Sequence, residues 1–120
     1  MFDHVGIGVK DLERSREFYV KALAPLGLGV TRDFGVALGI GKPDKPIFWI
    51  ASGYANSPVH LAFRADNHAQ VDAFYEAAIS AGAKDNGKPG PRPQYHPDYY
   101  GAFVIDLNGN NLEAVCHKPL

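Results

Sequence analysis

The stretch His4-Val5-Gly6-Ile7-Gly8-Val9 is the most informative about the fold, because its pattern begins again 56 residues later at His60. In both copies apolar residues alternate with small or polar ones, which is typical of a strand with one face on a core. Each copy leads through a polar turn to a helix with a Phe-Tyr pair, Phe18-Tyr19 in the first and Phe74-Tyr75 in the second. Self-similarity at a constant offset indicates a duplicated module.

The first copy predicts a β-α-β-β-β order. Its helix should run from Leu12 to Leu23, with Asp11 as N-cap, and end before Pro25 and Gly27. Three short strands should follow at roughly Gly29–Arg32, Val36–Ile40 and Ile47–Ala51, with a turn at residues 43–46.

The second copy should contain a strand at His60–Arg64 and a helix from about His68 to Ala81. Its last strands, Tyr99–Leu107 and Asn111–Cys116, are joined by Asn108-Gly109, which is a strong hairpin signal. The intervening residues, 85–97, hold four prolines and predict a long loop without helix or central strand. A loop of this length in a small domain is more often functional than idle.

These elements predict an α+β fold built from two βαβββ modules in tandem. Module one covers about residues 1–52, the linker about 53–58 and module two about 59–120, all within a single domain. The sheets should form a curved mixed sheet around a cleft, with the helices on the outside.

Charge and composition exclude several classes of partner. The chain carries 12 basic and 13 acidic residues, without the charge excess of a nucleic-acid or anionic-membrane surface. No apolar stretch approaches the roughly 20 residues of a membrane helix, and Met1-Phe2-Asp3-His4 lacks the layout of a signal peptide. We therefore expect a cytoplasmic protein. The single cysteine, Cys116, permits no internal disulfide.

Glu113 lies in the middle of a short apolar strand, where a carboxylate is costly to bury without a partner. When the last strands of the two modules are compared, Glu113 falls on Trp49 at an offset of 64. The eight extra residues are expected in the proline-rich loop. His4, Trp49, His60 and Glu113 thus occupy symmetry-related places on the faces away from the helices.

Two imidazoles and one carboxylate, His4, His60 and Glu113, form a 2-His-1-carboxylate set that leaves positions open on a divalent metal. Ligand type does not choose among Ni, Co, Zn, Mn and Fe(II). Taken singly, each histidine could be a surface or hydrogen-bonded residue, and Glu113 a solvated or paired acid. Their symmetry-related placement favours ligation.

Other polar and aromatic residues are candidates for substrate contacts. Arg64 shares the face of His60 and could bind an anionic group, or form a salt bridge. Trp49 and Tyr99 could shape the cleft. Together with Tyr95 and Tyr99, His96 and Tyr100 lie on or just after the loop and could form a lid over the cleft, with His96 or Tyr100 as an acid/base group. The alternative is an exposed aromatic loop or a dimer contact.

The quoted motifs, with Asn108-Gly109-Asn110-Asn111-Leu112-Glu113 closing the second module, resemble the glyoxalase/bleomycin-resistance/dioxygenase superfamily, also called vicinal oxygen chelate. The resemblance covers essentially the whole chain. It implies one divalent metal held by His4, His60 and Glu113, a small-molecule substrate, and a homodimer in which modules pair within or across chains.

The resemblance leaves the reaction open. Where glyoxalase I has a glutamate that also serves as base, this chain has Trp49, so we expect weak lactoylglutathione lyase activity or none. The remaining set is similar to that of extradiol dioxygenases and of fosfomycin-modifying thiol transferases. The sequence thus predicts a lyase/isomerase-type or dioxygenase-type metalloenzyme. One alternative is a metal-free binding protein of the bleomycin-resistance type, and another is a structural or regulatory dimer.

Overall fold

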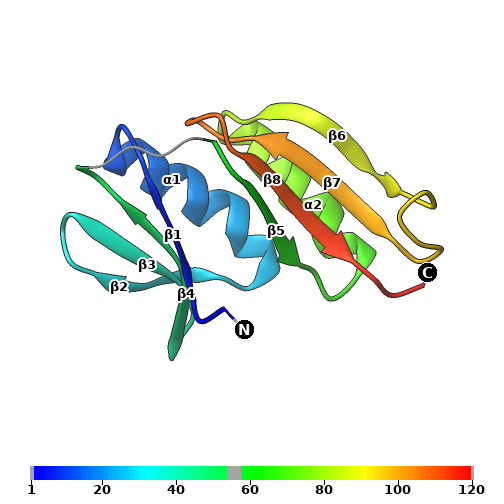
Figure 1. Ribbon diagram of the computed structural model, residues 1–120, viewed down its shortest axis with the longest axis horizontal. Helices are drawn as coiled ribbons and strands as arrows, with labels where there is room; N and C mark the ends of the chain where they lie inside the picture. The colour runs from blue at the N-terminus through cyan, green and yellow to red at the C-terminus, as the bar shows by residue number, and fades with distance from the viewer. Residues whose placement is uncertain (1, 54–57, 120) are drawn as a thin grey trace.

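The computed structural model describes residues 2–53 and 58–119, so the linker predicted at 53–58 lies mostly outside the described residues. The first module contains β1 (Val5–Gly8), α1 (Leu12–Leu23), the short 3-10 helix η1 (Ala24–Leu26), β2 (Gly29–Asp33), β3 (Ala37–Lys42) and β4 (Lys45–Ala51). The second contains β5 (His60–Arg64), α2 (His68–Ser80), β6 (Lys84–Pro91), β7 (Tyr100–Ile105) and β8 (Asn111–Cys116). The predicted α+β class with two βαβββ modules is confirmed (Figure 1).

The predicted mixed sheet is present as two four-stranded sheets with the same topology. Their strand orders are β1-β4-β3-β2 and β5-β8-β7-β6. Strand β4 is therefore an inner strand of the first sheet, and β8 is an inner strand of the second. Trp49 pairs with Gly6 and Gly39, whereas Glu113 pairs with Ala62 and Phe103. Trp49 and Glu113 therefore occupy equivalent positions, as the offset of 64 predicts.

Both helices begin at a side-chain cap that the sequence supplies. The Asp11 carboxylate accepts a hydrogen bond from the Arg14 N–H at 3.1 Å, and the Asn67 side chain accepts one from the Gln70 N–H at 2.8 Å. Such caps satisfy amide groups that have no partner within the helix. Neither α1 nor α2 is long and apolar enough to cross a membrane, and no other helix of the described residues is.

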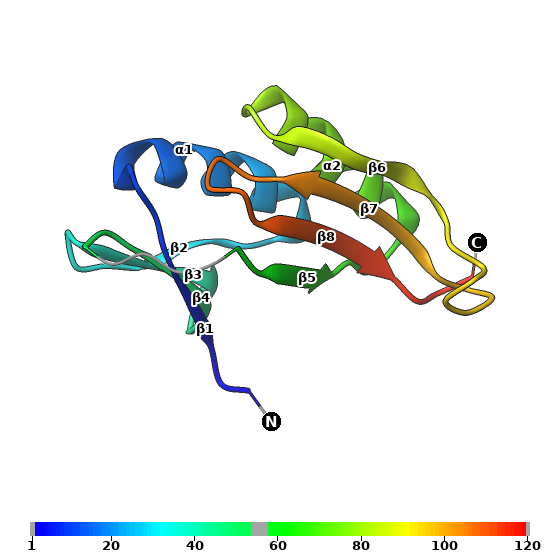
Figure 2. The same ribbon diagram turned by 45° about the horizontal axis from the view of Figure 1, so that its top comes forward.

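The helical faces of the two sheets share one core. Tyr19 packs edge-on against Phe48, and Phe48 packs against Phe63 of the other module with ring centroids 5.6 Å apart. Helices α1 and α2 also pack against each other, and Figure 2 shows them side by side with a sheet belonging to each. Because the helical faces converge on this core, the helix-free face of each sheet points away from it.

A buried polar cluster joins the modules at the hairpin turn before β8. The Asp106 carboxylate accepts hydrogen bonds from the Tyr19 hydroxyl of α1, the Asn110 side chain, and the backbone N–H groups of Asn108 and Asn110. Burial and the adjacent Asp106 carboxylate raise the pKa of Tyr19 well above its ordinary value. Tyr19 therefore stays protonated and can donate to Asp106.

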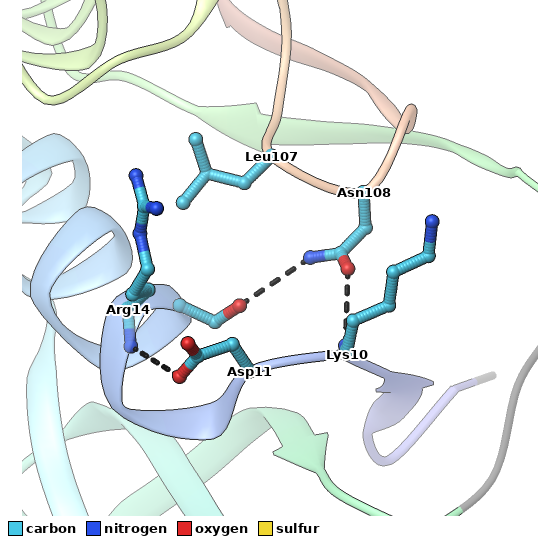
Figure 3. Close-up of a pocket in the computed structure, with 6 residues that line it drawn as sticks. Lys10, Asp11, Arg14, Leu107 and Asn108 are labelled. Carbon is cyan, nitrogen blue, oxygen red and sulfur yellow. Dashed lines mark hydrogen bonds between the residues drawn. The ribbon is translucent and has the colours of Figure 1, made fainter.

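The same turn also meets the start of α1 (Figure 3). The Asn108 side chain accepts from the Lys10 N–H at 3.1 Å and donates to the Ser15 hydroxyl at 3.3 Å. These contacts fix the register of one module against the other.

The proline-rich segment departs from its prediction. Its first part, expected as loop, is strand β6, and only the residues between Pro91 and Tyr100 connect β6 to β7 without strand. The prediction was wrong because proline is excluded from central strands but tolerated on edges, and β6 is an edge strand. Its pairing with β7 is irregular around Gly87, where the register shifts.

Candidate functional site

The helix-free face of the second sheet carries a pocket of about 350 Å³. It is lined by His60 from β5, Phe103 from β7, Glu113 from β8, and Tyr95 and Tyr99 from the segment before β7. Alternation explains this set, because Phe103 lies directly opposite Glu113 in the β7–β8 pair and their side chains share a face. The pocket is therefore built by sheet register together with one connecting segment.

Glu113 is buried, with 2% of its surface exposed, and both of its oxygens have partners. Oε1 lies 3.0 Å from His60 Nε2, and Oε2 accepts a hydrogen bond from the Tyr99 hydroxyl. The sequence prediction that this acid needs a compensating partner is thus confirmed, and His60 is one such partner.

The two nitrogens of His60 face different groups. Nδ1 lies 3.2 Å from the Asn111 carbonyl oxygen, which can only accept a hydrogen bond, so Nδ1 carries a proton. A neutral imidazole has a single N–H, and its Nε2 then presents a lone pair to the Glu113 carboxylate. The contact between Nε2 and Oε1 is therefore made either through a proton held between the two atoms or through a cation that both atoms bind.

The geometry of this pair fits a divalent metal. Adjacent ligand atoms on an octahedral ion with bonds of about 2.1 Å lie about 3.0 Å apart, and the His60–Glu113 contact is 3.0 Å. A carbonyl holding the opposite ring nitrogen is also the usual way in which proteins orient a histidine ligand. His60 and Glu113 thus form two-thirds of the predicted ligand set.

His4 lies apart from this pair. Its Nδ1 is 2.8 Å from Asp3 Oδ1, and Lys45 Nζ contacts the other Asp3 oxygen at 2.7 Å. The His4 hydrogen bond, followed by Lys45, lowers the pKa of Asp3 to about 2. Among residues 2–53 and 58–119, no three His, Cys, Asp or Glu side chains are grouped closely enough to hold a metal.

Trp49 and Arg64 also lie outside the pocket of Glu113. Trp49 stacks on Phe34 with ring centroids 5.8 Å apart, and its ring covers Gly39, where a Cβ would come within 2.9 Å of it. Arg64 shares the exposed side of β5 with His60 but lines a different cavity, of about 260 Å³, which it shares with Leu28 and Ile47 among others.

Tyr100, a predicted acid/base group, lies on the opposite face of the sheet. It pairs with the buried Cys116, its hydroxyl donates to Asp72 on α2 at 2.7 Å, and its ring stacks on His68. Burial and the Asp72 carboxylate raise the pKa of Tyr100 to about 12. The structure therefore does not bring Tyr100 to the pocket, because strand alternation turns it toward the helix.

His96, the other predicted acid/base group, is engaged outside the pocket lining. The Asp98 backbone N–H donates to His96 Nδ1 at 3.0 Å, so this nitrogen is an acceptor and Nε2 is the donor of the ring. That Nε2–H donates to Nδ1 of His117 at 2.6 Å.

Sequence reasoning missed two residues of this region. Phe103 lines the pocket, and the alternation of Tyr99, Gly101 and Phe103 in the predicted strand Tyr99–Leu107 could have placed it beside Tyr99. The pairing of His117 with His96 joins residues 21 apart in the chain, and no local pattern signals such a contact.

Comparison with known proteins adds the following. The sequence model of the Glyoxalase/Bleomycin resistance protein/Dioxygenase superfamily matches residues 1–114. A crystal structure of a glyoxalase/bleomycin resistance protein from Albidiferax ferrireducens T118 is 32% identical, with a TM-score of 0.86 over 97% of this chain and 98% of that one. A glyoxalase I mutant from Zea mays is 25% identical, with a TM-score of 0.73 over 95% of this chain and 46% of that one.

A glyoxalase/bleomycin resistance protein/dioxygenase family enzyme from Burkholderia phytofirmans PsJN, at 20% identity and a TM-score of 0.73, covers 97% of this chain and 98% of its own and shares the fold. No functionally curated protein matches the sequence. The match over residues 1–114 and the likeness to the Albidiferax protein agree with the paired modules described above, and this chain belongs to the glyoxalase/bleomycin resistance/dioxygenase superfamily.

Proposed function

We propose that this protein is a divalent-metal-dependent enzyme that acts on a small oxygenated substrate, by lyase/isomerase-type or dioxygenase-type chemistry. The observation that carries the proposal is the buried Glu113 carboxylate facing His60 Nε2 at 3.0 Å, while Asn111 holds the other ring nitrogen. A divalent ion held by such a set supplies Lewis-acid chemistry to substrate oxygens.

The third ligand, His4, is proposed to come from a second copy of the chain in a homodimer. Two features support this arrangement. No complete ligand set is grouped within the described part of one chain. In addition, the helix-free side of β4 carries Trp49 stacked on Phe34, and the Phe34 side chain is left 69% exposed. Exposed aromatic surface of this kind favours burial against a partner.

In this homodimer the first module of one copy faces the second module of the other. Trp49 then forms a wall opposite Glu113 and contacts substrate, and Arg64 meets an anionic substrate group at the rim. Because Trp49 can neither bind a metal nor accept a proton, Glu113 is the only carboxylate ligand. We therefore expect little or no turnover of the methylglyoxal–glutathione hemithioacetal.

The first test is the metal content of the wild-type protein. After incubation with Ni, Co, Mn, Fe(II) and Zn in turn and removal of free ion, about one ion per chain is expected with at least one of these metals. His60→Ala should retain none, whereas His68→Ala, a histidine on the helical side, should match wild type. A wild-type protein that stays metal-free with all five ions would overturn the proposal.

A second candidate function is metal-free sequestration of a planar aromatic molecule. The pocket supports it, because three of its five lining residues, Tyr95, Tyr99 and Phe103, are aromatic. In that case a proton rather than a metal ion lies between His60 Nε2 and Glu113 Oε1. The His4→Ala variant would then still bind the aromatic molecule, whereas the metalloenzyme proposal expects this variant to lose its metal.

A further inference from the structure

The two oxygens of Glu113 are not equivalent. Oε1 faces His60, while Oε2 accepts a hydrogen bond from the Tyr99 hydroxyl. A free carboxylate can bind a metal through one oxygen or both. With Oε2 engaged by Tyr99, only Oε1 is directed toward the place that the metal would take.

The Tyr99–Glu113 contact is closely fitted by the strand beneath it. A Cβ at Gly101 would come within 3.2 Å of the Tyr99 ring and 3.3 Å of Glu113 Oε2. These separations are tighter than ordinary van der Waals contact, so glycine at this position lets the phenol and the carboxylate approach each other.

The Tyr99 ring also contacts two histidines. It packs in T-shaped geometry against His96 and His117, with ring centroids 5.3 Å away in each case, and these two histidines are hydrogen bonded to each other at 2.6 Å. The backbone N–H of Asp98 fixes the orientation of the His96 ring. The segment between β6 and β7 therefore contacts β8 through Tyr99 and Glu113, and it contacts the residue that follows β8 through His96 and His117.

We propose that Tyr99 is a positioning residue that holds Glu113 as a one-oxygen ligand and so keeps one more coordination position open for substrate. This role rests on the proposed metal site, and it differs from the direct substrate contact predicted from the sequence. Tyr99 acts through Glu113, so its removal changes how the metal is coordinated more than whether it is bound.

The test uses Co(II) as the probe, because its visible absorption weakens as its coordination number rises. Tyr99→Phe keeps the ring but frees Oε2, so we expect a clearly weaker visible band than wild type at full occupancy. Affinity should fall by about tenfold, the lower end of the effect of removing a partner of a metal ligand. Tyr75→Phe is the matched control, because Tyr75 also loses a phenol–carboxylate hydrogen bond, to Asp85.

The outcomes separate the two proposals. A Tyr99→Phe spectrum identical to that of wild type, with Co(II) bound in both, overturns the positioning role and leaves the metal site intact. The same weakening in Tyr75→Phe also overturns it, because a general loosening of the fold would then explain the change. Failure of the wild-type protein to bind Co(II), when the four other ions also fail, overturns the metal site itself and the positioning role with it.

Discussion

Replacing Glu113 with glutamine is expected to lower the affinity of the protein for a divalent ion by at least about 100-fold, beyond the effect of losing a partner of a metal ligand. Glutamine keeps the shape of the side chain and an oxygen that accepts from Tyr99, but it removes the negative charge beside His60. The measurement is a competition titration against a chromogenic chelator. Glu76→Gln, on the exposed side of α2, is the control.

Folding and metal binding are separable in this variant. Burying a neutral amide costs less than burying a carboxylate, so the free energy of unfolding of the metal-free Glu113→Gln protein should not fall substantially. Unchanged metal affinity in a folded Glu113→Gln protein would show that the ion binds elsewhere.

Replacing Asp106 with alanine is expected to lower the free energy of unfolding by about 3–5 kcal/mol. The side chain is 6% exposed and accepts from Tyr19, from the Asn110 amide and from two backbone N–H groups, all of which would lose their partner. This is a large share of the roughly 5–15 kcal/mol of a typical domain. Urea unfolding measures the loss, and Glu17→Ala on the exposed side of α1 should change stability by less than about 0.5 kcal/mol.

Tyr19→Phe tests the same cluster through pH. Folding raises the pKa of Tyr19. The contribution of Tyr19 to the free energy of unfolding is therefore fully present below the ordinary tyrosine pKa of about 10, and it is lost as the pH rises from there toward the higher pKa of the folded state. The variant should lose about 1–2 kcal/mol at neutral pH and show a shallower decline of stability above pH 10 than wild type. If stability fell equally steeply with pH above pH 10 in the variant and in wild type, the pKa of Tyr19 would not be raised by folding.

Much of the fold could be predicted from the sequence, because the residue patterns that indicate its strands and helices are periodic. The repeat of His and Phe-Tyr at a fixed spacing gave the two modules, and the change of offset to 64 placed Trp49 and Glu113 in equivalent registers. Strand β6 was not predicted, because its prolines exclude a central strand but are compatible with either a loop or an edge strand.

The candidate site could be predicted from the sequence only in part. Alternation within strands assigns a side chain to a face, which places His60 and Glu113 together and could have separated Tyr99 from Tyr100. It does not say which surface lies opposite that face. Trp49 lies on the other sheet and His4 immediately precedes its strand β1, and the two helix-free faces point away from the core that the two modules share.

In the homodimer that we propose, one metal site takes His4 from one copy of the chain and His60 with Glu113 from the other. This arrangement is tested by co-expressing His4→Ala and Glu113→Ala under different tags and purifying the mixed dimer. Neither variant alone should retain metal, but the mixed dimer contains one complete site and should hold about half of the wild-type content. A mixed dimer of His60→Ala and Glu113→Ala, whose defects fall in the same half of the site, should hold none. A metal-free mixed dimer of His4→Ala and Glu113→Ala would show that the two copies do not share a metal site.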